Sequence, residues 1–251
     1  MELSSIASQY TLPSLGKIYG REIDPVVTLR SMTTADEMRR LNPTDRPCKA
    51  MAEIIDSCIE QSLPISSYDM CLGDYQYLLH RLRVVTYGAK YPVVTVCPYC
   101  GVSSKQDLNL EDLPVLQYTD DILNLMEFDL PKTGKHIKLR FQTPRMLDEV
   151  ALRAKELRKK QGDAFVDPTL SLTVESMIDT VDGHKPDIVK LSQWVSSLPM
   201  MDTNIIIQRA EKLNNSIGVS RDLDIECDAC GLDYKTQMPV NAEFFRPRAD
   251  L

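Results

Sequence analysis

Two short stretches, Cys97-Pro98-Tyr99-Cys100-Gly101 and Cys227-Asp228-Ala229-Cys230-Gly231, decide the fold of this chain. Each holds two cysteines separated by two residues, the spacing at which a metal knuckle supplies two thiolates to zinc. The two pairs lie 126 residues apart, across positions 101–226, whereas a compact zinc ribbon separates its pairs by roughly 15 to 20 residues. If one ion takes all four sulfurs, the residues between the pairs form an insertion into the metal module.

The surroundings of the two pairs are alike. A strand-like stretch precedes each pair, and a lysine, Lys105 or Lys235, is the fifth residue after its second cysteine. The glycine after each pair suits a turn with positive φ, in which backbone N–H groups point at sulfur. Four thiolates leave zinc no open position, so we expect a structural zinc ion rather than a catalytic one. An iron–sulfur cluster on the same sulfurs stays open, as do separate reduced or redox-active pairs. A thioredoxin-like pair is disfavoured because neither pair precedes a helical pattern.

Composition indicates an ordinary globular protein. The chain has 251 residues, of which 43% are hydrophobic and 26% charged, and its formal net charge is −7. No apolar run approaches the ~20 residues of a membrane span. The first residues lack the features of a secretory signal, so we expect a reducing compartment, with thiols available as ligands. The remaining cysteines, Cys48, Cys58 and Cys71, are interpreted as small core residues.

The expected fold class is α+β: a mainly helical body with a split four-cysteine zinc ribbon and a small β-hairpin. The hairpin is predicted at 127–142, around a turn at 131–135. A helical stripe from Leu170 to Val181 follows, and Asp202 or Thr203 is expected to cap a later helix. We predict three parts, which are an N-terminal loop, strand and helical region; a split zinc ribbon; and an inserted hairpin and helical region. Their respective ranges are 1–91, then 92–114 with 219–251, and 115–218.

Catalytic chemistry has little support in the sequence. The histidines His80, His136 and His184 form no His-Glu-x-x-His pair, and no glycine-rich phosphate loop is present. We therefore expect no enzymatic activity and no small-molecule substrate. An acidic chain is also a poor default binder of nucleic acid, where phosphate contacts dominate affinity. A basic cluster on a predicted helix is interpreted as a solvated face, with an acidic protein partner as the alternative. Its members are Arg153, Lys155, Arg158, Lys159 and Lys160.

Two apolar segments near the chain ends are candidate partner-binding surfaces. Phe244, Phe245 and Arg246 form one segment, and the loop from Leu12 to Tyr19 contains the other. Packing into the chain's own core is the simpler interpretation for the phenylalanines. Docking of these side chains into a partner is the alternative that would carry function.

Several short motifs follow one another along nearly the whole chain. They are Leu12-Pro13-Ser14-x-Gly16-x-x-Tyr19-Gly20, Thr28-Leu29-Arg30, Met32-Thr33-Thr34-x-Asp36-Glu37, Gly73-Asp74-x-x-x-Leu78-Leu79-x-x-Leu82-Arg83, Tyr87-Gly88, Cys97-Pro98-x-Cys100-Gly101, Leu198-Pro199-x-x-Asp202, Cys227-x-x-Cys230-Gly231 and Phe244-Phe245-x-Pro247. In this order they resemble a baseplate protein family of contractile-tailed phages of the T-even type. The resemblance is carried by the order of the motifs rather than by any one of them.

The resemblance implies a baseplate hub or hub assembly protein, with a non-enzymatic role in building or forming the central baseplate. Its metal ligands would fall on Cys97, Cys100, Cys227 and Cys230. It further implies other baseplate or tail proteins as partners, and a place in the virion tail after assembly in the host cytoplasm. The alternative function is a zinc-ribbon adaptor in a nucleic-acid or transcription complex.

Overall fold

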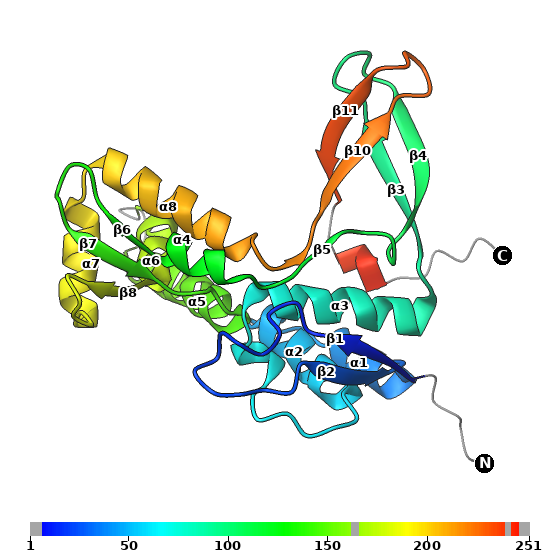
Figure 1. Cartoon of the computed structure of the whole chain (residues 1–251), viewed down its shortest axis with the longest axis horizontal. Helices are drawn as coiled ribbons and strands as arrows, with labels where there is room; N and C mark the ends of the chain where they lie inside the picture. The colour runs from blue at the N-terminus through cyan, green and yellow to red at the C-terminus, as the bar shows by residue number, and fades with distance from the viewer. Residues whose placement is uncertain (1–6, 162–165, 239–241, 246–251) are drawn as a thin grey trace.

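The computed structural model describes residues 7–161, 166–238 and 242–245. The described N-terminal part combines one antiparallel strand pair with three α-helices (Figure 1). Alternating burial along the second strand places Val27 and Leu29 in the core. The elements are β1 (Ala7–Thr11), β2 (Val26–Arg30), α1 (Thr34–Arg40), α2 (Pro47–Cys58) and α3 (Leu72–Tyr87).

Two antiparallel hairpins form a double-hairpin arm that projects from the body above α3 (Figure 1). One hairpin directly follows α3, whose C-cap residue is Gly88 with a φ of 86°. The other comes from near the end of the chain, so the arm joins segments distant in sequence. The strands are β3 (Lys90–Val96) and β4 (Ser103–Asn109) in the first hairpin, and β10 (Asp222–Glu226) and β11 (Asp233–Gln237) in the second.

The intervening part, between the two hairpins in sequence, combines helices and strands and lies at the opposite end of the molecule from the arm (Figure 1). Its elements are β5 (Val115–Leu116), α4 (Leu123–Met126), β6 (Glu127–Asp129), β7 (His136–Leu139), α5 (Pro144–Gln161), α6 (Thr169–Met177), β8 (Ile178–Val181), α7 (Ile188–Ser197), α8 (Met200–Asn214) and β9 (Gly218–Val219). The first and last strands, β5 and β9, form an antiparallel pair. Between them lies a three-stranded antiparallel sheet in the order β6-β7-β8.

The described residues contain two separate hydrophobic clusters. The first runs from Leu12 to Leu113 and resumes from Leu223 to Phe245, so it unites the N-terminal part with the arm. The second lies between Ile122 and Ile217, inside the intervening part. Where the two meet, Gly73 packs so tightly that a Cβ there would lie 2.3 Å from the Ile217 carbonyl oxygen. A side chain at this position would therefore force the backbones apart.

The mixed helix-and-sheet class and the 127–142 hairpin are as predicted, but two details differ. The stripe that predicted one helix through Val181 is a helix to Met177 followed by a strand, because Ile178–Val181 pairs with β7. Asp202 does not cap its helix, whose N-cap is Pro199. Its carboxylate instead accepts the N–H groups of Lys132 and Thr133, both at 2.9 Å. Among the described residues, no helix is long and apolar enough to cross a membrane.

Candidate metal centre

The four predicted cysteine ligands meet at the tip of the arm. All four sulfurs lie within 4.8 Å of one another. The sulfur of Cys97 lies 3.8 Å from that of Cys230, and the sulfur of Cys100 lies 3.6 Å from that of Cys227. Zinc bound about 2.3 Å from each of four sulfurs holds them roughly 3.8 Å apart at the corners of a tetrahedron. The spacing across the two hairpins therefore fits one ion of this size.

The two knuckles are nearly the same backbone turn. In the first, Cys97 donates its N–H to the Val102 carbonyl at 3.0 Å, and Gly101 donates to the Cys97 carbonyl at 2.9 Å. The second repeats both bonds, from Cys227 to Leu232 at 3.1 Å and from Gly231 to Cys227 at 2.8 Å. The glycines have φ values of 73° and 69°, which explains why a residue without a Cβ follows each pair.

Each knuckle contributes one buried and one exposed cysteine. Cys97 and Cys227 are 1% and 2% exposed, whereas Cys100 and Cys230 face solvent. The backbone N–H groups of Cys230 and Ala229 lower the pKa of Cys227 to about 7. At Cys230 the N–H of Leu232 acts in the same direction, but desolvation by the surrounding atoms and the thiols of the other three cysteines outweigh it and raise the pKa to about 12. The Cys227 thiolate thus forms readily, while the raised pKa values of Cys100 and Cys230 show that these two thiols resist ionisation beside it. A divalent cation would remove that obstacle.

The two hairpins are also joined below the sulfurs. The Thr95 and Tyr234 hydroxyls lie 2.7 Å apart and are buried, which forms a hydrogen bond between β3 and β11. Tyr234 therefore points into the arm rather than to solvent. No local sequence pattern indicates this pair, because the two residues lie 139 positions apart.

At its base the arm rests on α3 through buried aromatic side chains. The Phe244 ring lies 5.0 Å from His80 and 5.3 Å from Tyr91, measured between ring centroids. Arg83 places its guanidinium 5.9 Å from the centre of the same ring. Burial lowers the pKa of His80 to about 4, so this histidine is neutral at pH 7.

The predicted partner-binding residues lie mostly inside the chain. Leu12 and Phe244 are fully buried, and Phe245 is 6% exposed. Tyr19 is partly buried, with its hydroxyl 2.6 Å from Asp74. Arg246 lies outside the described residues. Because Leu12, Phe244 and Phe245 are buried, their side chains contribute to stability. Contact of the five predicted residues with a partner stays a prediction.

A buried carboxylate explains why the loop around Tyr19 is ordered. Asp74, at the start of α3, accepts the Ser14 N–H at 2.9 Å, the Ser14 hydroxyl and the Tyr19 hydroxyl. Burial raises the pKa of Asp74 against the opposing effect of these donors. The Cys71 thiol, also buried, accepts the Asp74 N–H at 3.4 Å. In the sequence, Ser14 and Asp74 belong to separate motifs, and no local pattern connects them.

The remaining cysteines and histidines lie away from the four-sulfur site. Cys58 and Cys71 are buried as predicted, and Cys48 is half-buried. His136 is exposed at the β6–β7 hairpin, where Asp129 at 2.8 Å raises its pKa. His184 is exposed beside the turn that follows β8.

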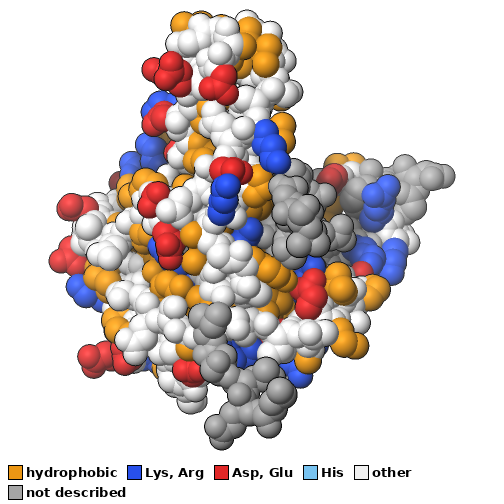
Figure 2. Space-filling model, turned by 90° about the vertical axis from the view of Figure 1, so that its right-hand side faces the viewer, with side chains coloured by type: hydrophobic (Ala, Val, Ile, Leu, Met, Phe, Trp, Pro, Cys, Tyr) orange, Lys and Arg blue, Asp and Glu red, His pale blue; other side chains and the backbone are white. Residues whose placement is uncertain are grey.

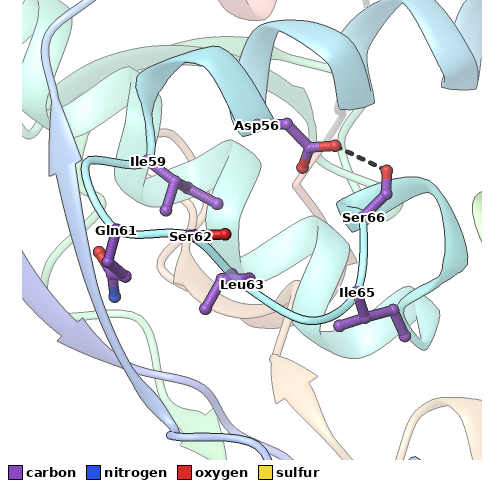
Figure 3. Close-up of a pocket in the computed structure, with 7 residues that line it drawn as sticks. All are labelled: Asp56, Ile59, Gln61, Ser62, Leu63, Ile65 and Ser66. Atoms are coloured by element: carbon purple, nitrogen blue, oxygen red, sulfur yellow. Dashed lines mark hydrogen bonds between the residues drawn. The ribbon is translucent and has the colours of Figure 1, made fainter.

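A surface pocket follows the end of α2 (Figure 3). The Gln61 side chain holds the backbone of β2, accepting from the Thr28 N–H at 3.0 Å and donating to the Val26 carbonyl at 2.6 Å. Asp56 accepts from Ser66 and from the Ser67 N–H, at 2.6 and 2.9 Å. The pocket's acidic and amide side chains are thus engaged in holding loop and strand backbone.

The fold and the site together define a class of protein: a mixed helical and stranded body in which two distant hairpins share one four-cysteine centre. The family model for T4 bacteriophage base plate protein matches residues 5–246. Because the match spans most of its length, the chain belongs to this family. The comparisons with curated proteins and with solved structures each gave no match.

Family membership makes this chain a structural component of a phage baseplate. The family implies a location in the virion tail and suggests other phage tail proteins as partners. It agrees with the resemblance drawn from the order of the motifs, at the level of the baseplate as a whole.

Proposed function

We propose that the chain is a non-enzymatic structural or assembly component of the hub region of the baseplate. The family match over residues 5–246 is the observation that supports a structural role in the baseplate. The hub location is the finer part of the proposal and follows from the resemblance in motif order. We further propose that assembly takes place in the host cytoplasm, where reduced cysteines are available to bind metal.

The proposed cofactor is one structural zinc ion on Cys97, Cys100, Cys227 and Cys230. Two sulfur separations close to that of a zinc tetrahedron support a single ion. An iron–sulfur cluster distributes its cysteines over several irons and needs a wider arrangement. When bound, the ion supplies no reaction; it holds the two hairpins together.

The proposed division of the chain follows from this role. Residues 92–114 and 219–251 form the split zinc ribbon, residues 1–91 the supporting region, and residues 115–218 the insertion. Two observations support the division: the separate hydrophobic cluster between Ile122 and Ile217, and the β5–β9 pair at its entry and exit. The first cluster includes both the supporting region and the arm, so these two are expected to unfold together.

Quantitative mass spectrometry of purified tails and of isolated hub intermediates would test the proposed role. We expect the chain in at least one of these fractions, at a fixed ratio to the other hub proteins. Its absence from both would contradict a hub or assembly role. Detection in the peripheral parts of the baseplate but not in the hub would keep the family assignment and remove the hub proposal.

A further inference from the structure

The tip of the arm exposes apolar side chains around the four sulfurs. Tyr99 is 63% exposed, Val102 46% and Leu232 49%. Val96, the last residue of β3 before the first knuckle, is 61% exposed. Figure 2 shows the arm projecting from the body, with hydrophobic side chains at its upper end. We call Val96, Tyr99, Val102 and Leu232 the tip surface.

The knuckle turns themselves explain this exposure. Val102 and Leu232 occupy equivalent positions, and each accepts the N–H of its knuckle's first cysteine through its carbonyl. The turn uses their backbone and leaves both side chains in solvent. The second cysteine of each knuckle, Cys100 or Cys230, is also exposed. A projecting apolar surface of this kind is typical of an interaction site.

Acidic residues surround the second knuckle. Glu226 stands directly opposite Asp233 in the β10–β11 register, and both are exposed. Asp228, also exposed, lies within the knuckle loop. Like charges opposite each other weaken a strand pair, and a cation brought close to them relieves the repulsion. The charge beside the tip surface is therefore complementary to a basic partner.

We propose that the tip surface inserts into an apolar socket, rimmed by lysine or arginine, on another protein of the baseplate. Tyr99 would be the anchor, since a tyrosine combines a large apolar area with few rotatable bonds and is enriched in binding hot spots. The four-sulfur centre would keep the surface rigid, so that little conformational entropy is lost on docking. This partner surface rests on the proposed baseplate role.

Nucleic acid is a poorer match for the same surface. Stacking of bases needs exposed aromatic rings within a basic groove. Tyr99 is exposed, but Tyr234 is 5% exposed and points into the arm. The carboxylates of Glu226, Asp228 and Asp233 would repel phosphate.

Photo-crosslinking in infected cells would identify what the tip surface contacts. The variant Tyr99→p-benzoylphenylalanine is irradiated, and the crosslinked peptides from purified tails and hub intermediates are sequenced by mass spectrometry. We expect crosslinks to a different baseplate protein, at apolar residues with lysine or arginine close by. Crosslinks to a second copy of this chain, or to nucleic acid, would overturn the proposal. So would their absence from particles that contain the variant.

A matched set of variants separates docking from folding. Tyr99→Ser with Leu232→Ser removes the main apolar contacts, and Met38→Ser changes an equally exposed side chain on α1. We expect the double variant to keep its metal content and its far-UV spectrum but to enter particles about tenfold less, as for loss of a hot spot. Met38→Ser should enter normally.

Each result bears on one of the two proposals. Absence of the wild-type chain from all particles removes the baseplate role itself. Normal entry of the folded double variant removes only the docking surface. As a test of charge, Glu226→Lys with Asp233→Lys should reduce entry as well, whereas unchanged entry would exclude a basic rim.

Discussion

The two hairpins of the arm share one backbone plan and carry different side chains. Both place one buried and one exposed cysteine at the tip, with a glycine of positive φ after the second. Yet the first knuckle presents Pro98 and Tyr99 where the second presents Asp228 and Ala229. The cysteines and glycines that the four-sulfur geometry requires are the same in both knuckles, whereas the residues between the cysteines differ. The comparison separates residues that serve the centre from residues free to serve anchoring or partners.

Replacing one of the four proposed metal ligands tests the similarity of the two hairpins with the largest expected effect. Cys100→Ser and Cys230→Ser should each lose zinc and unfold the arm, because metal binding supplies on the order of 10 kcal/mol to such modules. Both residues are exposed, so serine itself adds little strain. The control is Cys58→Ser, at a buried position in α2 away from the arm, and this variant should keep its metal. Elemental analysis of the purified variants checks this, and equal zinc in all three would refute the shared site.

The hairpins also differ in how they are held to the body. The first continues directly from α3, whereas the second is followed by the buried ring of Phe244 beneath the arm. Phe244→Ala should lower the free energy of unfolding by about 3–5 kcal/mol, as for a large buried aromatic side chain. Phe244→Leu should cost clearly less. Urea unfolding measures both, and an alanine variant as stable as the wild type would mean that the ring does not anchor the second hairpin.

Local chemistry explains which parts of this arrangement could be predicted from the sequence. The cysteine pairs and their glycines were identifiable because metal ligation fixes residue type and spacing within five positions. Long-range partners were not, since Thr95 and Tyr234 each look like ordinary strand residues. Likewise β8 follows α6 without a glycine or proline boundary, and only its pairing with β7 makes it a strand.

Apolar residues near the chain ends illustrate a second limit. By sequence, Leu12, Phe244 and Phe245 fit either a core or a docking surface, with core packing the simpler interpretation for the phenylalanines. Burial assigns all three side chains to the core. Asp202 is a residue type that commonly caps helices, but its carboxylate instead accepts the backbone N–H groups of Lys132 and Thr133. Hydrogen-bonding capacity was visible in the sequence, whereas the choice of partner depended on tertiary contacts.

The contact between Phe244 and His80 makes this anchor sensitive to acid. His80 has its pKa lowered to about 4 by burial, against about 6.5 in the unfolded chain. Above pH 6.5 both states are neutral; below it the unfolded state binds the proton first, so stability falls as the pH drops towards 4. The expected loss at pH 5 is about 2 kcal/mol. Urea unfolding at pH 7 and pH 5 measures this loss.

The control for this prediction is His80→Phe, which keeps a ring against Phe244 and cannot titrate. Acid also protonates the cysteines in every variant, so the informative quantity is the difference between wild type and His80→Phe. We expect the wild type to lose about 2 kcal/mol more than the variant between the two pH values. Parallel losses would show that His80 is not held neutral in the fold.

The hydroxyl pair between β3 and β11 joins the hairpins without metal. Tyr234→Phe removes the 2.7 Å hydrogen bond to Thr95 and should cost about 1 kcal/mol. A double-mutant cycle with Thr95→Val isolates the pair from other effects of each change. Additive losses in the cycle would indicate that the two hydroxyls do not stabilise each other.

Charge on the second hairpin gives the smallest expected effect. Glu226 faces Asp233, whereas its neighbour two residues earlier, Asp224, faces Lys235 with 3.5 Å between the charged atoms. Glu226→Gln should therefore slightly raise the urea midpoint, and Asp224→Asn should slightly lower it. Both shifts should shrink in high salt, because exposed charges are screened. If Glu226→Gln lowers the midpoint as much as Asp224→Asn does, the opposed carboxylates are not repulsive, and the second hairpin has no unfavourable charge for a basic partner to relieve.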